Sequence, residues 1–253
     1  MASARRKDES LRRKAYHYIQ HRILSGMIRP GTTLSELALA RETRMSRTPI
    51  REAIHQLLAE GWLEHAPGGR VVVTSLERDD IVELYELREA LEVYAVRKAA
   101  CRGLPPADRG LLRELCERIR AFADLLRTSG RERLNEMEME EFLSADMKFH
   151  LLLLRGASNR RLMKLVTDTR LLTRIFSFER PGHDAALLER IYQYHSGIVE
   201  ALMSGDGERA AQLLGEHIRA SLQERLELFD QWQRESELQD LLTAPLAAPG
   251  RSQ

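Results

Sequence analysis

The chain has 253 residues, of which 43% are hydrophobic and 30% charged, and its formal net charge is +1. This composition excludes an intrinsically disordered protein, and the length favours two domains over one. The sequence has no run of about 18 apolar residues and no apolar signal core after its basic N-terminus, so we expect a cytoplasmic protein without a membrane partner. The two cysteines, Cys101 and Cys116, are too few for a disulfide framework.

The small net charge hides an asymmetry along the chain. Residues 1–75 contain 13 Lys and Arg against 7 Asp and Glu, a net +6, whereas the remainder contains 26 against 31, a net −5. A basic head on an acidic body favours a head that binds a polyanion. The basic run at the very start is equally typical of a solvated tail, and we expect residues 1–10 to be disordered.

Three helical patterns occupy the head. The apolar positions of 11–25 follow a helical period that stops at a glycine. A second helix is expected over 33–41, where Thr33 and Glu36 have the spacing of a capping box. A third is expected to start at Ser46, a typical N-cap residue.

Two extended runs, 62–65 and 70–74, follow these helices and are joined by the turn sequence Ala-Pro-Gly-Gly. This pattern is typical of a two-stranded hairpin. Three helices and a hairpin predict a winged helix-turn-helix over residues 1–75, in which the third helix lies in the DNA major groove.

Arginines near the start of the third helix are the candidates for reading DNA. Arg47 and Arg51 carry guanidinium groups that match the O6 and N7 atoms of guanine, so we expect them to contact bases. The remaining expected DNA-binding residues, most of which would hold phosphates and fix the register, are Arg44, Ser46, Thr48, Gly68, Gly69 and Arg70.

The run Ser46-Arg47-Thr48-Pro49-Ile50-Arg51-Glu52-Ala53, followed by Leu57, Glu60-Gly61 and a wing that ends in three valines, resembles the recognition segment of GntR-type bacterial transcriptional regulators. One position departs from that pattern. Many members of the FadR-like branch carry a polar or basic residue that touches DNA in the second helix, where this chain has Leu37. The alternative reading of the head is a helical protein-interaction module.

The acidic body is expected to be an all-α antiparallel bundle of about six helices over residues 76–234, with Ser75 as the first cap. Glycine- and proline-containing stretches separate the helical patterns, which cover 77–100, 107–127, 132–155, 159–178, 184–204 and 206–232. The proline-containing segment 235–253 is expected to be a disordered tail. With the head included, the predicted fold is mainly α.

Arg88 falls on the inward stripe of the first body helix, beside Leu84 and Leu91. A guanidinium in a core must meet an anion, because it cannot lose its charge. Two readings stay open: Arg88 binds the carboxylate or phosphate of a ligand, or it pairs with an internal Asp or Glu.

A carboxylate and an imidazole stand one helical turn apart at Asp146 and His150, on one apolar stripe. His195 lies 10 residues before Gly205 and His217 lies 12 after it, so on antiparallel helices they reach nearly the same height. Each histidine taken singly is more typical of a satisfied core residue. Together they suit a divalent metal, with zinc first and nickel, iron or manganese as alternatives. The histidines expected outside this site are His17, His21, His55, His65 and His183.

The same segments resemble the FCD ligand-binding domain of the FadR-like branch. In that family an Asp-x-x-x-His pair and two later histidines bind a divalent metal, which implies Asp146, His150, His195 and His217 as ligands here. The run 87–92 matches the segment whose arginine contacts acidic effectors in relatives, which implies an effector contact for Arg88. The resemblance further implies a homodimer on a palindromic DNA operator, and a small carboxylate effector such as a sugar acid, hydroxy acid or amino acid.

The sequence therefore predicts a ligand-responsive, DNA-binding transcriptional regulator that is not an enzyme. Two alternatives remain: a regulator in which the metal ion itself is the signal, and a metalloenzyme. The second is disfavoured, because no further Glu, Ser or Cys near the metal residues stands out as a base or nucleophile.

Overall fold

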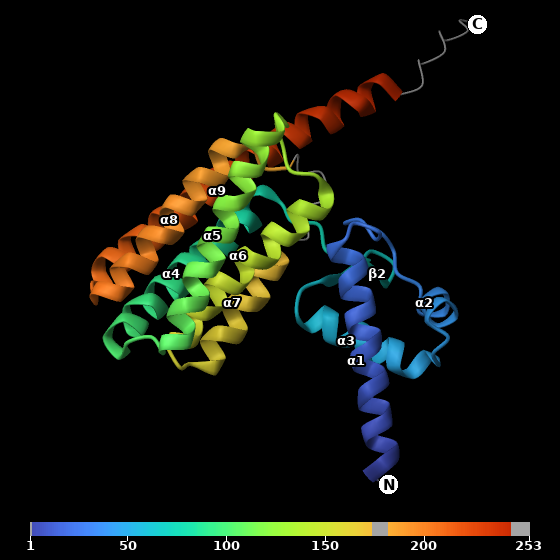
Figure 1. Cartoon of the computed structure of the whole chain (residues 1–253). Helices are drawn as coiled ribbons and strands as arrows, with labels where there is room; N and C mark the ends of the chain where they lie inside the picture. The colour runs from blue at the N-terminus through green and yellow to red at the C-terminus, as the bar shows by residue number, and fades with distance from the viewer. Residues whose placement is uncertain (1, 174–181, 244–253) are drawn as a thin grey trace, which may run out of the picture.

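The computed structural model describes residues 2–173 and 182–243, which form an N-terminal head and a larger helical body beside it (Figure 1). The head consists of α1 (Ala2–Leu24), α2 (Glu36–Thr43), α3 (Arg47–Ala59), β1 (Leu63–Ala66) and β2 (Arg70–Val73). The body consists of α4 (Arg78–Arg102), α5 (Pro106–Ser129), α6 (Glu136–Gly156), α7 (Arg160–Leu172), α8 (Ala185–Ser204) and α9 (Gly207–Thr243). None of the helices in these ranges is long and apolar enough to cross a membrane.

An apolar core holds the head together. Ile19 from α1, Ile50 and Leu57 from α3, and Trp62 before the wing are each at most 1% exposed. The two strands pair antiparallel, and the residue pairs at their ends are Leu63–Val73 and Ala66–Arg70. The predicted winged helix-turn-helix is confirmed.

Two ends in the head differ from the prediction. Helix α1 already begins at Ala2, so the expectation of disorder over residues 1–10 is wrong for the described residues; no glycine or proline interrupts this run, which is rich in helix-forming residues. Helix α2 is capped by Ser35, whose Oγ accepts a hydrogen bond from the N–H of Ala38, and not by Thr33. Thr33 instead forms a β-bridge with Val72 of the wing, where a β-branched residue suits extended backbone.

The body is the predicted six-helix bundle over the described residues. Helix α4 contacts α6, α7 and α9, while α5 contacts α6 and α8, and α8 contacts α9. Leu112, Phe149, Ile198 and Leu214 come from four of these helices and are fully buried in one shared core. The amphipathic stripes read from the sequence therefore face a common interior.

Two helix ends in the body differ from the prediction. Helix α4 is capped at Glu77 and not Ser75, because the carboxylate of Asp80 accepts the N–H of Glu77 at 2.7 Å. Helix α9 continues to Thr243, so residues 235–243 are not a disordered tail; the sequence after Trp232 contains no helix breaker before Pro245. The last part of the helix expected over 159–178 lies outside the described residues.

Helix α7 joins the body to the head. Leu162 and Val166 are buried in the body. At the other end of the same helix, Leu171 and Leu172 pack against the apolar core of the head. One short helix thus contacts both parts of the chain.

Candidate metal centre

Helix α6 presents Asp146 and His150 on one face. A capping box fixes its first turn: Asn135 Oδ1 accepts the N–H of Glu138 at 2.9 Å, and the Glu138 carboxylate accepts the N–H of Asn135 at 3.0 Å. The two site residues are four positions apart on the helix, so they point the same way. The His150 ring is fully buried, Asp146 keeps 24% exposure, and Asp146 Oδ1 lies 3.6 Å from His150 Nε2.

Helices α8 and α9 bring the two later histidines together. Gly205 ends α8 with a φ of 78°, a conformation that glycine adopts without strain, and α9 starts two residues later. His195 and His217 face each other across this antiparallel pair, with 3.2 Å between their Nε2 atoms. The His195 ring also stacks on Phe149 at a centroid distance of 3.8 Å, which fixes its plane.

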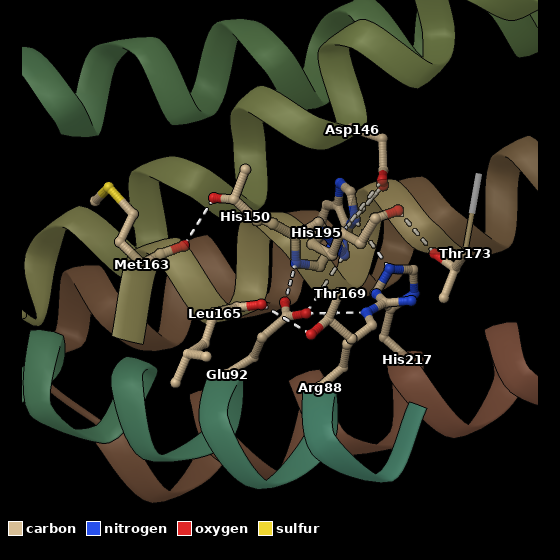
Figure 2. A network of polar contacts seen from close by, with 12 residues as sticks. Arg88, Glu92, Asp146, His150, Met163, Leu165, Thr169, Thr173, His195 and His217 are labelled. Carbon is tan, nitrogen blue, oxygen red and sulfur yellow. Dashed lines mark hydrogen bonds and ion pairs between the residues drawn. The ribbon is translucent and has the colours of Figure 1, made fainter. Parts of the chain in front are cut away.

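Figure 2 shows the four side chains converging between α6, α8 and α9. One donor atom from each of Asp146, His150, His195 and His217 lies within 4.8 Å of all the others. Ligands at about 2.0–2.2 Å on opposite sides of an ion are about 4.4 Å apart, so a small contraction would let all four bind one ion. Within the described part of the chain, His150 Nε2 is buried and has no hydrogen-bond partner. An ion among these four groups would satisfy it.

The surroundings of the cluster favour the protonation states in which its side chains can bind a metal. Burial, with repulsion from nearby cations, lowers the pKa of His217 to about 3 and lowers that of His195 well below its ordinary value. Burial alone would raise the pKa of Asp146, but His150 and Arg170 hold it well below its ordinary value. Neutral imidazoles and an ionised carboxylate are the forms that bind divalent metals.

A second ring of charged residues surrounds the cluster, and sequence reasoning missed two of its members. Glu92, 2% exposed on α4, lies 2.8 Å from His150 Nδ1 through Oε2. Arg170, 4% exposed on α7, lies 3.3 Å from Asp146 Oδ2 and 3.5 Å from Glu92 Oε1. Glu92 stands one turn after Arg88 on the same buried stripe, a spacing that could have identified it.

Arg88 takes the internal pairing in this structure. Its Nε donates to Glu92 Oε1 at 3.0 Å, and its guanidinium lies over the ring of Tyr85 at 4.5 Å. Arg88 also lines a cavity next to the metal cluster, so the internal pair does not remove it from reach of a ligand.

This cavity has a volume of about 80 Å³ and opens beside Asp146 and His217. Its other polar lining residues include Arg170, Thr173, His183, Ser221, Glu224 and Arg225. His183, expected to lie outside the site, is buried here with Nδ1 3.7 Å from Glu224 Oε1. No partner spacing marked His183 in the sequence, because its neighbours come from other helices. Burial raises the pKa of Glu224 to about 7 and lowers that of Arg225.

The expected DNA-binding residues are all exposed on the head: Arg44, Ser46, Arg47, Thr48, Arg51, Gly68, Gly69 and Arg70. Arg47 and Arg51 project from the first turns of α3, and both pair with Glu36 of α2 at 3.0 Å. Sequence reasoning missed Glu36 in this role, since it read the residue only as part of a cap. Gly68 and Gly69 have positive φ at the tip of the wing, and Leu37 is 50% exposed on α2.

Both the head and the body of the chain match known protein families. The FCD domain family model matches residues 83–220, and the model of bacterial regulatory proteins, gntR family, matches residues 11–73. The chain is 33% identical over 138 residues to the Nta operon transcriptional regulator of Aminobacter aminovorans, a match that covers 54% of this chain and 60% of that protein.

A second relative aligns over more of its length. The probable D-xylose utilization operon transcriptional repressor of Paenarthrobacter nicotinovorans is 30% identical over 209 residues, which cover 81% of this chain and 84% of that protein. Among solved structures, E. coli McbR/YncC shares the fold with a TM-score of 0.70 and 22% identity, over 87% of this chain and 98% of that one.

Proposed function

This chain belongs to the GntR family of DNA-binding bacterial transcriptional regulators, with an FCD domain after the DNA-binding head, and from that premise we propose that the FCD domain holds a divalent metal and a small carboxylate effector. The relatives are regulators and not enzymes. We propose residues 1–75 as the DNA-binding domain and 76–234 as the metal and effector domain.

The observation that carries the metal proposal is the convergence of Asp146, His150, His195 and His217 in a buried pocket with an unpartnered His150 Nε2. Three imidazoles and one carboxylate match the donor set of zinc, and nickel, iron and manganese accept the same donors. A bound ion would polarise a coordinated oxygen of the effector and hold it in place.

The charge of the cavity supports an anionic effector. Arg88, Arg170 and Arg225 surround it, whereas Glu92 and Asp146 are the two carboxylates whose pKa is lowered. These three arginines exceed the two ionised carboxylates by one positive charge, and burial raises the pKa of the third carboxyl group, Glu224, toward its neutral form. A divalent ion would add to this excess, and an effector carboxylate would offset it.

The size of the cavity supports a small effector. Pockets that hold drug-sized ligands usually measure about 300–1,000 Å³, so a cavity of about 80 Å³ favours a small ligand. A short sugar acid, hydroxy acid or amino acid therefore fits better than a long acyl chain. The hydroxyls of Thr173 and Ser221 would contact its polar groups.

Helix α7 offers a route from the effector to DNA. Arg170 contacts Asp146 and Glu92, and the next two residues, Leu171 and Leu172, pack against the head. An effector that draws Arg170 toward itself would move this contact. Such coupling requires the effector to bind with different affinity to two arrangements of the head relative to the body. The difference in binding free energy is commonly about 1–3 kcal/mol.

We further propose a homodimer, because members of this family act on operators and a two-fold dimer matches a palindromic site. Within it, Arg47 and Arg51 would contact bases, while Arg44, Ser46, Thr48 and the wing would contact mainly phosphates.

Thermal unfolding tests the effector proposal. Zinc-loaded protein would be screened against small carboxylates, and the same acids would be added to zinc-stripped protein as a control. We expect at least one acid to raise the melting temperature only when zinc is present, and to change affinity for an operator selected from random DNA. A change in DNA affinity with zinc alone, and none with any acid, would favour the metal-signal alternative.

A further inference from the structure

The buried carboxylate of Glu92 contacts both the metal cluster and the arginines beside the effector cavity. Glu92 Oε2 lies 2.8 Å from His150 Nδ1, while Oε1 accepts a hydrogen bond from Arg88 Nε at 3.0 Å and lies 3.5 Å from Arg170. Figure 2 shows Glu92 reaching from α4 toward His150, on the side of that ring away from Asp146. Its side chain is 2% exposed, so these groups, and not water, are its partners.

The contact with His150 determines which ring nitrogen can bind a metal. A carboxylate accepts only from a protonated nitrogen, so it favours the tautomer with the proton on Nδ1. The Nε2 lone pair then faces Asp146, His195 and His217. His150 Nδ1 and Glu92 Oε2 are within hydrogen-bonding distance, although their alignment in this structure falls short of a hydrogen bond.

We infer that Glu92 is a positioning residue for the metal: it holds His150 with Nε2 turned to the ion, and it ties this ligand to the two arginines beside the effector cavity. The inference rests on the proposed function and deepens it. Carboxylates commonly orient metal-bound imidazoles in this way. The guanidinium groups of Arg88 and Arg170 beside Glu92 favour a carboxylate that carries its negative charge.

Because Glu92 contacts both His150 and the two arginines, effector binding can affect metal binding. An effector carboxylate that draws Arg88 or Arg170 away from Glu92 leaves the full negative charge of Glu92 on the His150 side. The imidazole then becomes a stronger donor to the ion. Effector binding therefore raises metal affinity, and by linkage the metal raises effector affinity by the same factor.

Zinc affinity tests the positioning role. Glu92→Gln keeps the size of the side chain and removes its charge, and Glu89→Gln on the same helix is the matched control, because Glu89 pairs with Arg219 at the surface. We expect zinc affinity, measured by competition with a chromophoric chelator, to fall about 10- to 100-fold in Glu92→Gln and to stay within about twofold in Glu89→Gln. A folded Glu92→Gln protein with wild-type zinc affinity would overturn the inference.

A second measurement needs no variant, since Glu92→Gln leaves two buried arginines without their carboxylate and could fail to fold. Nitrogen-15 NMR of metal-free wild-type protein at about pH 8.5, above the ordinary imidazole pKa of about 6.5, identifies the tautomer of each histidine. We expect His150 to carry its proton on Nδ1, and a proton on Nε2 would overturn the inference. Failure of the wild-type protein to take up zinc would instead refute the proposed function.

Discussion

Replacing Glu224 with glutamine should change how the stability of the protein depends on pH. Burial is the main cause that raises the pKa of Glu224 from 4.5 to about 7; Arg190 lowers it, whereas Asp184 and Glu227 raise it further. A raised carboxyl pKa means that the folded state favours the protonated form. The stability this confers is complete below about pH 4.5 and is lost as the pH rises through about 7.

The size of the effect follows from the shift. A difference of about 2.5 pKa units corresponds to about 3 kcal/mol of unfolding free energy, so ionised Glu224 costs the wild-type protein about that much above pH 7. Glutamine is neutral at every pH and avoids this cost. Relative to wild type, Glu224→Gln should therefore gain about 2–3 kcal/mol between about pH 5 and pH 8.

Urea unfolding at these two pH values measures the difference. Glu227→Gln is the control, because Glu227 stands one turn further along α9 and is exposed. It should follow the wild-type pH dependence. If Glu224→Gln also follows the wild-type curve, Glu224 is ionised at no cost in the folded state, and burial does not raise its pKa.

Three further outcomes are expected in the head, at its contact with the body and at the effector cavity. Arg47→Ala should reduce discrimination between bases by about tenfold, whereas Arg44→Ala should weaken binding to all sequences and lower its salt dependence; selection from random DNA and titrations at several salt concentrations separate the two. Leu172→Ala should leave zinc binding intact but reduce the effect of a bound acid on operator affinity to less than about twofold. Leu165→Ala, on the exposed face of α7, should preserve that effect. Arg88→Ala should abolish the response to the acid while operator binding in the absence of acid persists, and an unaltered dose response would exclude Arg88 as an effector contact.

Periodicity predicted the elements well, because a stripe of apolar residues determines which face of a helix is buried. The same rule predicted the metal cluster: Asp146 and His150 are one turn apart, and His195 and His217 lie at similar heights about Gly205. Both relations follow from spacing within one helix or across a single tight turn, so they can be predicted from the sequence.

The groups that the sequence did not reveal are joined across helices. Glu92 reaches His150 from α4 and Arg170 reaches Asp146 from α7, and no spacing along the chain encodes which buried charge meets which. Arg88 shows the limit clearly. Its pairing with Glu92, one turn further along the same helix, is a spacing that the sequence contains, whereas the contacts of Glu92 with His150 and Arg170 depend on the packing of the helices.

Calorimetric titration of the metal-free protein with zinc tests whether the four residues form one metal site. We expect one zinc per chain in the wild type and no measurable zinc binding in His217→Ala, with the variant still folded as judged by circular dichroism. Full zinc stoichiometry in that variant, or none in the wild type, would contradict a site built from Asp146, His150, His195 and His217.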